Sequence, residues 1–240
     1  MVVTRAESQA QPLIDAVEAT GGTPVVLPLL ELVDAEDGGA ALNAAIGAGG
    51  ADDWLVVLSP NGARRLPEGP FPGNVAAIAA GTAQVLTAMG YAVDLIPKTA
   101  SSVGLLEAFA DRDVAGRVII AQAEVGRPEL AHGLRERGVV VDVIAAYRNV
   151  MPELDPGAVA QAADAEVVVF ASPSAVTRYV EHVASTPKRA PGVSPAPKRA
   201  VCIGTVTAAE AESAGFEIAV ADSPTIEAIM TTLKGFVRKK

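Results

Sequence analysis

Hydroxyl side chains recur directly before helix-like segments in this chain, and several of them directly follow a short apolar run. Six such junctions carry serine or threonine, at Ser59-Pro60, Thr82, Ser101-Ser102, Ser172-Pro173, Thr205 with Thr207, and Ser223-Pro224-Thr225. In a parallel sheet these junctions lie at the carboxyl ends of the strands, where helix N-termini present N–H groups to anions. Capping of the helix is the simpler explanation for any one junction. Six junctions, duplicated in the two halves, favour an anionic ligand.

One tyrosine stands at a position suited to acid–base chemistry. Tyr147 follows the apolar run Val139–Ala145, where one half of the chain ends and the next begins. A phenol at such a crossing can donate a proton or a hydrogen bond to a ligand. Plain packing is the alternative role for Tyr147, and it is the role we expect for Tyr91 and Tyr179.

The usual signatures of cofactors, metals and covalent catalysis are missing from the sequence. Gly47-Ala-Gly-Gly50 follows a helix pattern and fits neither a dinucleotide fingerprint nor a P-loop. His132 and His182 are far apart in sequence, and we expect both to face solvent rather than to bind a metal. The single cysteine, Cys202, lies inside an apolar run and is interpreted as core packing. We therefore expect neither a cofactor nor a metal.

The elements that must position these residues alternate between short apolar runs and alanine-rich amphipathic stretches that end at glycine. The runs predict buried strands at Val25–Leu30, Trp54–Leu58, Val75–Ala80, Arg117–Ala121, Val139–Ala145, Glu166–Ala171 and Ala200–Ile203. Helices are expected between them, for example at Ser8–Ala19 and at Pro128–Arg137. This alternation predicts an α/β fold with parallel sheets covered by helices.

The chain also contains an internal repeat. The stretch that begins at Trp54 and runs through Ser59-Pro60 matches the stretch from Val167 through Ser172-Pro173, with strand, Ser-Pro and helix start in register. A second pair, Ala77–Ala83 and Val201–Ala208, follows in the same order, and Val2–Leu30 matches Val118–Tyr147 more weakly. Two similar α/β halves are therefore expected, facing each other across a cleft.

Composition and charge narrow the classes of function. Half of the 240 residues are hydrophobic and 20% are charged, which is typical of a globular protein. No apolar run approaches the roughly 18 residues of a membrane span, and no signal-peptide stretch opens the chain, so we expect a cytoplasmic protein. Eight of the 19 cations lie in the acid-free segments 185–199 and 234–240, which leaves 11 cations against 28 acids, a net −17, elsewhere. This negatively charged part of the chain repels nucleic acid and anionic lipid. If the ligand is an anion, a few individual cations and backbone amides must therefore bind it.

These residues, in this order, resemble the uroporphyrinogen-III synthase family, whose members close the linear tetrapyrrole hydroxymethylbilane. The matching pieces cover essentially the whole chain and comprise Val2–Ala6, Leu13–Pro28, both Ser-Pro junctions, Thr82-Ala83, Ser102–Leu106, Gly126–Gly138, Tyr147 and Thr207-Ala208. No single piece is specific, but their succession is. Ala79 departs from the family pattern, which carries glycine there as this chain does at Gly204, and the alanine slightly reduces access to the backbone.

The resemblance implies two flavodoxin-like domains with parallel sheets, joined by a two-stranded linker. One domain is expected to comprise residues 1–30 plus 150–240 and the other residues 34–145. The linker would then comprise residues 30–34 and 145–150, which places Tyr147 at the linker, on the cleft.

The resemblance also implies an activity, the cyclisation of hydroxymethylbilane to uroporphyrinogen III with inversion of ring D and loss of water through a spiro intermediate, in tetrapyrrole (haem, sirohaem and cobalamin) biosynthesis. No metal or cofactor takes part, and Tyr147 is the expected catalytic acid. The substrate carries eight carboxylates, and the residues expected to bind it are Thr4, Arg5, Ser59, Asn61, Thr82, Lys98, Ser101, Arg127, Ser172, Ser174 and Thr207. For the cations, a solvated surface charge is the alternative. We expect a monomer that contacts hydroxymethylbilane synthase transiently and binds neither nucleic acid nor membrane.

Three other interpretations compete with this one. A hinged two-domain protein that binds small anions without catalysis would share the α/β halves, but a periplasmic one should carry an export signal. A nucleotide-sugar glycosyltransferase would need a nucleotide site, and a receiver-like signalling module would need an acidic cluster after the first strand. The proline-rich segment 185–199 is expected to be a surface loop, with a lid over the ligand as the alternative.

Overall fold

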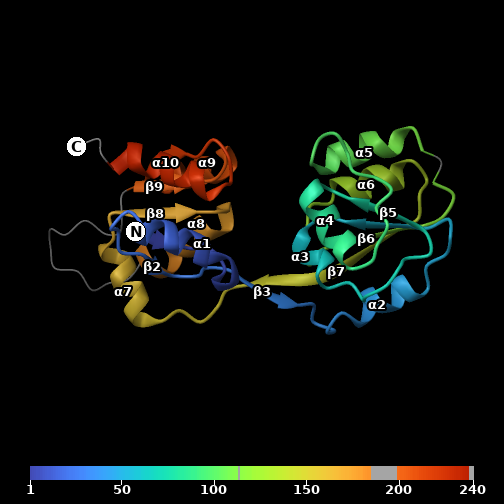
Figure 1. Cartoon of the computed structure of the whole chain (residues 1–240), viewed down its shortest axis with the longest axis horizontal. Coiled ribbons are helices and arrows are strands. Elements are labelled where there is room, and N and C mark those ends of the chain that lie inside the picture. The colour runs from blue at the N-terminus through green and yellow to red at the C-terminus, as the bar shows by residue number, and fades with distance from the viewer. Residues whose placement is uncertain (113, 185–198, 238–240) are drawn as a thin grey trace. The chain divides into compact units, whose positions relative to one another are not determined.

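The computed structural model describes residues 1–112, 114–184 and 199–237. Over these residues the chain divides into two compact units (Figure 1). Unit 1 combines Met1–Glu31 with Val150–Lys240, and unit 2 is Leu32–Asn149. Except for Arg199, the segment expected to be a surface loop lies outside the described residues. No helix within the described ranges is long and apolar enough to span a membrane.

Unit 2 is built on a five-stranded sheet in the order β3-β7-β6-β4-β5. Its strands are β3 (Glu31–Asp34), β4 (Trp54–Val57), β5 (Asn74–Ala77), β6 (Val118–Ala123) and β7 (Val141–Val150). Its helices are α2 (Ala40–Gly47), α3 (Pro60–Ala63), α4 (Ala80–Ala88), α5 (Ser102–Ala110) and α6 (Glu129–Glu136). The ladders that join β7, β6, β4 and β5 are all parallel, and Leu95 adds a parallel bridge beside Ala76 of β5.

Unit 1 has a parallel sheet in the order β10-β9-β8-β1-β2. Its strands are β1 (Val2–Val3), β2 (Val25–Val26), β8 (Val167–Phe170), β9 (Arg199–Cys202) and β10 (Glu217–Val220). Its helices are α1 (Glu7–Glu18), α7 (Pro156–Asp164), α8 (Pro173–Tyr179), α9 (Thr205–Ser213) and α10 (Ile226–Val237), with a π-turn, η1 (Val180–Ala184), after α8.

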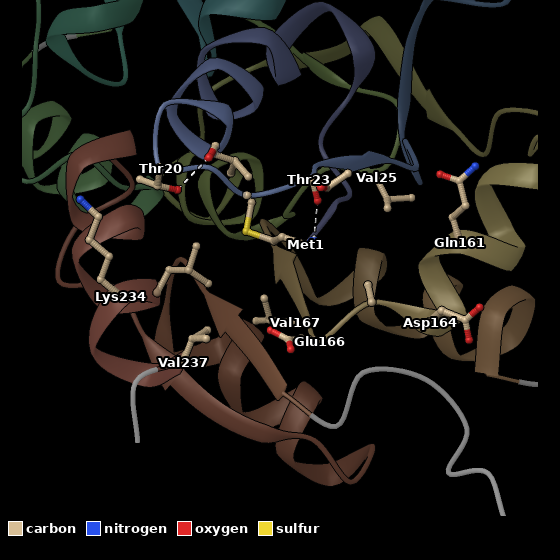
Figure 2. Close-up of a pocket in the computed structure, with 14 residues that line it drawn as sticks. Met1, Thr20, Thr23, Val25, Gln161, Asp164, Glu166, Val167, Lys234 and Val237 are labelled. Carbon is tan, nitrogen blue, oxygen red and sulfur yellow. Dashed lines mark hydrogen bonds between the residues drawn. The ribbon is translucent and has the colours of Figure 1, made fainter. Parts of the chain in front are cut away.

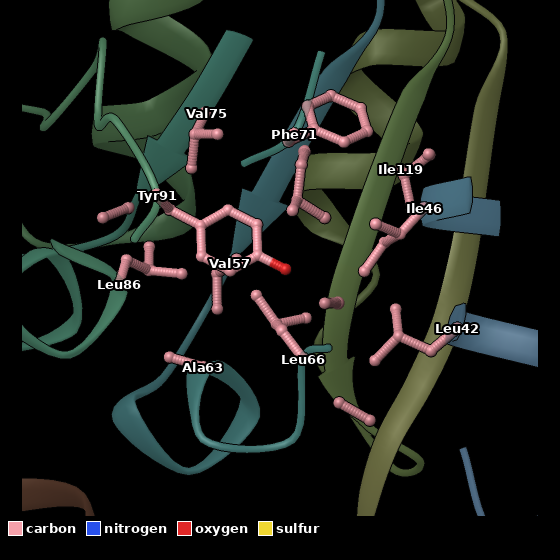
Figure 3. Close-up of a cluster of buried hydrophobic side chains, with 14 of the residues drawn as sticks. Leu42, Ile46, Val57, Ala63, Leu66, Phe71, Val75, Leu86, Tyr91 and Ile119 are labelled. Atoms are coloured by element: carbon pink, nitrogen blue, oxygen red, sulfur yellow. The ribbon is translucent and has the colours of Figure 1, made fainter. Parts of the chain in front are cut away.

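Helices cover both faces of each sheet because the strands are apolar on both faces. In β4, Leu55 and Val57 pack toward α2, α3 and α4, whereas Trp54 and Val56 pack toward α5 and α6. Figure 3 shows the first of these clusters, with Tyr91 among its aliphatic side chains. Each cluster of buried residues belongs wholly to one unit, so each unit has its own core in two layers.

The two sheets share one strand order, which confirms the internal repeat. From one edge, unit 1 runs β10-β9-β8-β1-β2, and unit 2 runs from Leu95 through β5-β4-β6 to β7. The strands followed by Ser-Pro, β4 and β8, therefore occupy the same place in their sheets. The mixed α/β class with two parallel sheets is also confirmed.

Two strands differ from their sequence-based limits. The ladder of β2 is regular only at Val25–Val26, although Leu27 and Leu29 still donate to the carbonyls of Val3 and Thr4. Strand β7 runs to Val150 rather than ending at Ala145, and β3 pairs along it. Tyr147 therefore lies within a strand rather than after one.

Candidate functional site

Three of the junction serines cap the helices that follow them. Ser59 Oγ accepts the N–H of Gly62 at 3.0 Å, Ser101 Oγ accepts that of Gly104 at 3.0 Å, and Ser172 Oγ accepts that of Ala175 at 3.3 Å. The Ser-Pro order suits this role because proline at the first helical position needs no hydrogen-bond partner. These three hydroxyls are thus already engaged by backbone groups of their own helices.

Two junctions lack a cap of this kind. Helix α4 begins after Ala79 and α9 after Gly204, and neither N-cap residue offers a side-chain hydrogen bond. The first N–H groups of both helices therefore lack the partner that serine supplies elsewhere. Ala79 has the same extended backbone as Ser59 (φ −158°, ψ 166° against φ −163°, ψ 156°), so the side chain alone makes the difference. An anion is the natural partner for such a helix end.

A threonine lies in the first turn of each uncapped helix. Thr82 in α4 is 1% exposed, and its Oγ1 has no hydrogen-bond partner among the described residues. Thr207, at the matching position of α9, is also buried. A buried hydroxyl without a partner is costly, so Thr82 lowers the stability of its surroundings by comparison with an apolar residue of the same shape.

Tyr147 is placed by an irregularity in its strand. The register between β6 and β7 shifts at Gln122/Ala123, so that Ala145 pairs with Gln122 but Tyr147 pairs with Ala123. The extra residue is Ala146, and Ala146 and Tyr147 consequently pack into the same core cluster, although neighbours in a regular strand face opposite ways. The Tyr147 side chain is buried, and its hydroxyl lies 3.2 Å from Ser59 Oγ.

A residue that sequence reasoning missed completes the surroundings of Tyr147. The guanidinium carbon of Arg65 lies 5.3 Å from the centre of the Tyr147 ring. The only available signal was the position of Arg65, six residues after Ser59, because Arg178 follows Ser172 by the same interval.

The cations predicted to bind the ligand have no partner among the described residues. Arg5 follows β1 and is half-buried, and burial lowers the pKa of its guanidinium. Lys98 and Arg127 are exposed. Within the described part of the chain, none of the three makes a hydrogen bond or an ion pair, so all three charges are available to an anion.

The remaining predicted residues are engaged to different degrees. Thr4 Oγ1 is buried and donates to the carbonyl of Val169 at 2.7 Å, and Ser174 Oγ lies 3.1 Å from Ser172 Oγ. The carbonyl of Asn61 accepts from Arg65 at 3.1 Å, whereas its side chain is half-buried. The structure thus joins Tyr147 to Ser59 in unit 2 and Ser172 to Ser174 in unit 1, and it gives Thr4 a role in joining β1 to β8.

The two packing tyrosines, the cysteine and the histidines lie as predicted. Tyr91 and Tyr179 are buried and donate their hydroxyls to the carbonyls of Pro67 and Ala162. Cys202 is fully buried, and burial raises the pKa of its thiol to about 11, so the thiolate is scarce near neutral pH. Both histidines are exposed. No cluster of three or more His, Cys, Asp or Glu suited to a metal occurs in the described ranges.

Unit 1 also has a pocket of about 650 Å³ at the amino ends of its strands, away from the strand-helix junctions that carry the predicted residues (Figure 2). Val25 and Val167, the first residues of β2 and β8, line it together with Met1, which precedes β1. The α-amino group of Met1 donates to the carbonyl of Thr23 at 2.8 Å. None of the predicted site residues lines this pocket.

Comparisons with known proteins identify the family of this chain. The sequence model of the family described as uroporphyrinogen-III synthase HemD matches residues 11–231. A uroporphyrinogen-III synthase from Synechococcus elongatus is 26% identical over 77% of this chain and 75% of its own length. A putative uroporphyrinogen-III synthase from Methanothermobacter thermautotrophicus is 28% identical over 97% of this chain and 96% of its own.

Solved structures share the fold. A mutant uroporphyrinogen III synthase from Thermus thermophilus superposes with a TM-score of 0.64 at 17% identity, covering 100% of this chain and 99% of that one. The uroporphyrinogen-III synthetase from Helicobacter pylori gives a TM-score of 0.63 at 16% identity, covering 99% and 98%. At this identity the structures support the fold, and the match over residues 11–231 supports the family. The chain belongs to the uroporphyrinogen-III synthase family.

Proposed function

We propose that this protein converts hydroxymethylbilane to uroporphyrinogen III, as a monomeric, cytoplasmic lyase that needs neither metal nor cofactor. The observation that carries the proposal is the family match over residues 11–231, within which Tyr147 and Ser59 lie in hydrogen-bond contact. The uncapped helix ends and free cations at the carboxyl edges of the sheets suit a substrate with many carboxylates.

The reaction places a modest demand on the protein. The C–O bond of the ring A hydroxymethyl group breaks, and the oxygen takes a proton and leaves as water, so that ring A becomes an azafulvene. The substituted α-carbon of ring D attacks the exposed methylene to form the spiro intermediate. The bond from this carbon to the ring C methylene then breaks, and the other α-carbon of ring D closes onto that methylene and loses a proton. One acid and a folded substrate suffice.

Tyr147 is the acid in this proposal. Because Ser59 Oγ accepts the N–H of Gly62, its own hydrogen can be donated to the oxygen of Tyr147. The phenolic proton is then directed away from Ser59 and toward the departing hydroxyl group. After the transfer, the same hydrogen bond from Ser59 stabilises the phenolate. Ser59 thus supports the acid in addition to capping α3.

Candidate groups for the substrate carboxylates occur in each unit. In unit 2 the proposed set is Ser59, Asn61, Thr82, Lys98, Ser101 and Arg127, and in unit 1 it is Thr4, Arg5, Ser172, Ser174 and Thr207. The amides at the starts of α4 and α9 and the three free cations contribute most directly. The capping serines contribute mainly through the helix ends that they hold in place.

The test is the isomer composition of the product. Purified protein is mixed with freshly generated hydroxymethylbilane, and the oxidised uroporphyrins are separated chromatographically. Isomer III is expected to predominate, whereas a control without protein gives isomer I by spontaneous closure. Isomer I alone in the presence of protein contradicts the proposal. If hydroxymethylbilane then still raised the thermal unfolding midpoint, binding of a small anion without catalysis would be the better interpretation.

A further inference from the structure

Two arginines occupy the same place in the two repeats. Arg65 follows the capping Ser59 by six residues, and Arg178 follows the capping Ser172 by six residues. Both strand-helix junctions occupy the same place in their sheets, after β4 and β8. A helix start of the same kind therefore delivers an arginine to an equivalent position in each unit.

Each arginine binds a segment of the chain where it passes from one unit to the other. Arg178 donates to the carbonyls of Leu29 at 2.6 Å and Val150 at 3.3 Å. Arg65 donates to the carbonyl of Leu32 at 3.3 Å and to the carboxylate of Asp34 at 3.0 Å. The planar fork of an arginine can reach several such acceptors at once, as the single charge of lysine cannot.

Arg65 has one further contact that bears on the reaction. Its guanidinium carbon lies 5.3 Å from the centre of the Tyr147 ring, and its side chain is only 22% exposed. A third hydrogen bond, to the carbonyl of Asn61 at 3.1 Å, ties the guanidinium to α3. Asn61 lies two residues after Ser59, the residue that contacts the Tyr147 hydroxyl. Arg65 thus links the ring of Tyr147 to the helix that carries its hydrogen-bond partner.

We propose that Arg65 is the positioning residue for Tyr147. The cation over the ring, held by Asp34, Leu32 and Asn61, fixes the angle at which the phenol meets Ser59 and the substrate. The bulge at Ala146 leaves this stretch of β7 irregular, so its side-chain direction needs support beyond the ladder. This inference rests on the proposed function, because the role it gives Arg65 is to orient the catalytic acid.

The first experiment separates positioning from general stability by a double-mutant cycle. Arg65→Met is expected to lower kcat for isomer III about tenfold with KM within about twofold, because a small misplacement of an acid acts on the transition state. In a Tyr147→Phe background the same change should cost less than about twofold, since the hydroxyl to be positioned is gone. Arg65→Lys, which keeps the charge but loses the fork, should fall between Arg65→Met and the wild type.

Arg178→Met is the matched control, because it removes the equivalent anchor from the unit that does not contain Tyr147. In the double variant with Tyr147→Phe, the fold-decrease in kcat should equal the product of the two single decreases, because the two changes are independent. The proposal is overturned if Arg65→Met also multiplies with Tyr147→Phe, or if Arg65→Met raises KM and leaves kcat unchanged. Circular dichroism establishes that each variant is folded, and Arg65→Lys serves the same cycle if Arg65→Met is not.

The second experiment needs no substrate and so separates this inference from the proposed function. The chain has three tyrosines, and labelling with [13Cζ]tyrosine gives three signals, of which Tyr147→Phe identifies one. Arg65→Met should shift the Tyr147 signal, whereas Arg178→Met should leave it in place. An unmoved Tyr147 signal in Arg65→Met overturns the positioning role. A shifted signal in a protein that makes no isomer III would instead reject the proposed function while upholding the contact.

Discussion

At the scale of single residues, a phenol and a serine hydroxyl 3.2 Å apart bear the chemical part of the proposal. Tyr147→Phe keeps the ring in the core and beneath Arg65 but removes the proton. We expect the rate of isomer III formation to fall about 10²- to 10⁴-fold, the usual contribution of a general acid. Tyr91→Phe is the control, because that phenol donates to the carbonyl of Pro67 and is not among the proposed site residues, and the rate of this variant should match the wild type. A Tyr147→Phe variant with full turnover would remove Tyr147 as the acid.

Thr82 and Thr4 are both buried, but we expect their replacement by valine to change the free energy of unfolding in different ways. Thr82 Oγ1 lacks a partner in the described chain, so Thr82→Val should leave the free energy of unfolding unchanged or raise it by up to about 1 kcal/mol. Thr4 Oγ1 donates to Val169, so Thr4→Val should lower it by about 1 kcal/mol. Urea unfolding measures both. Thr82→Val should also raise KM if the hydroxyl binds substrate, and an unchanged KM would assign Thr82 to packing alone.

Sequence reasoning located the hydroxyls more readily than it located their partners. Serine before proline after an apolar run is a local signal, and Ser59 and Ser172 lie where that signal places them. Arg65 and Tyr147 are 82 positions apart in sequence, so no local pattern predicts their contact. In addition, an arginine near a helix end is equally typical of a solvated surface. The unpartnered state of Thr82 depends on packing around it and has no local signature.

At the scale of elements, the difference between capped and uncapped helices predicts a conflict between stability and binding. Ala79→Ser should cap α4 as Ser59 caps α3, because the two residues have the same extended backbone. We expect the free energy of unfolding to rise by about 1 kcal/mol. The new hydroxyl would occupy the N–H groups proposed for a substrate carboxylate, so KM should rise as well.

Ser101→Ala is the converse change and supplies the control for Ala79→Ser. It should lower the free energy of unfolding by about 1 kcal/mol, since Gly104 N–H loses its acceptor. Because that N–H was not available to substrate in the first place, KM should change less than in Ala79→Ser. If Ala79→Ser stabilises the protein and leaves KM unchanged, the start of α4 does not bind substrate.

Two of the strands that the apolar runs did not mark, β3 and β10, are incompletely buried. Strands β4, β6, β8 and β9 were found within about two residues, because each is an apolar run buried on both faces. Strands β3 and β10 lie at the edges of their sheets and have exposed ends, so no apolar run marks them. The extension of β7 to Val150 depends on the bulge and on pairing with β3, which are tertiary features.

At the scale of the whole molecule, duplication explains why similar chemistry recurs in both units. Each sheet supplies a Ser-capped helix, an uncapped helix with a buried threonine, and an arginine that binds a crossing segment. The net charge of −9 does not attract an anionic substrate, so these local groups must overcome a repulsive field. The repeat could be predicted from the sequence alone. Which contacts the serine, threonine and arginine of each unit make could be seen only in the folded structure.

Each unit has its own core, but unit 2 is one continuous segment and unit 1 is made of two. We therefore expect unit 2 to fold as an isolated fragment and the longer segment of unit 1 not to. Residues 31–150 contain both clusters of buried residues of unit 2 and the whole of the β3-β7 pair. We expect this fragment to unfold cooperatively in urea and to keep the Tyr147 signal of the full chain, but to form no isomer III because Arg5 and Thr207 are absent. Residues 150–240 should not fold alone, because without β1 and β2 the fully buried strand β8 would become an unpaired edge of the sheet. A gradual, non-cooperative transition of 31–150 would show that unit 2 depends on its partner unit for stability.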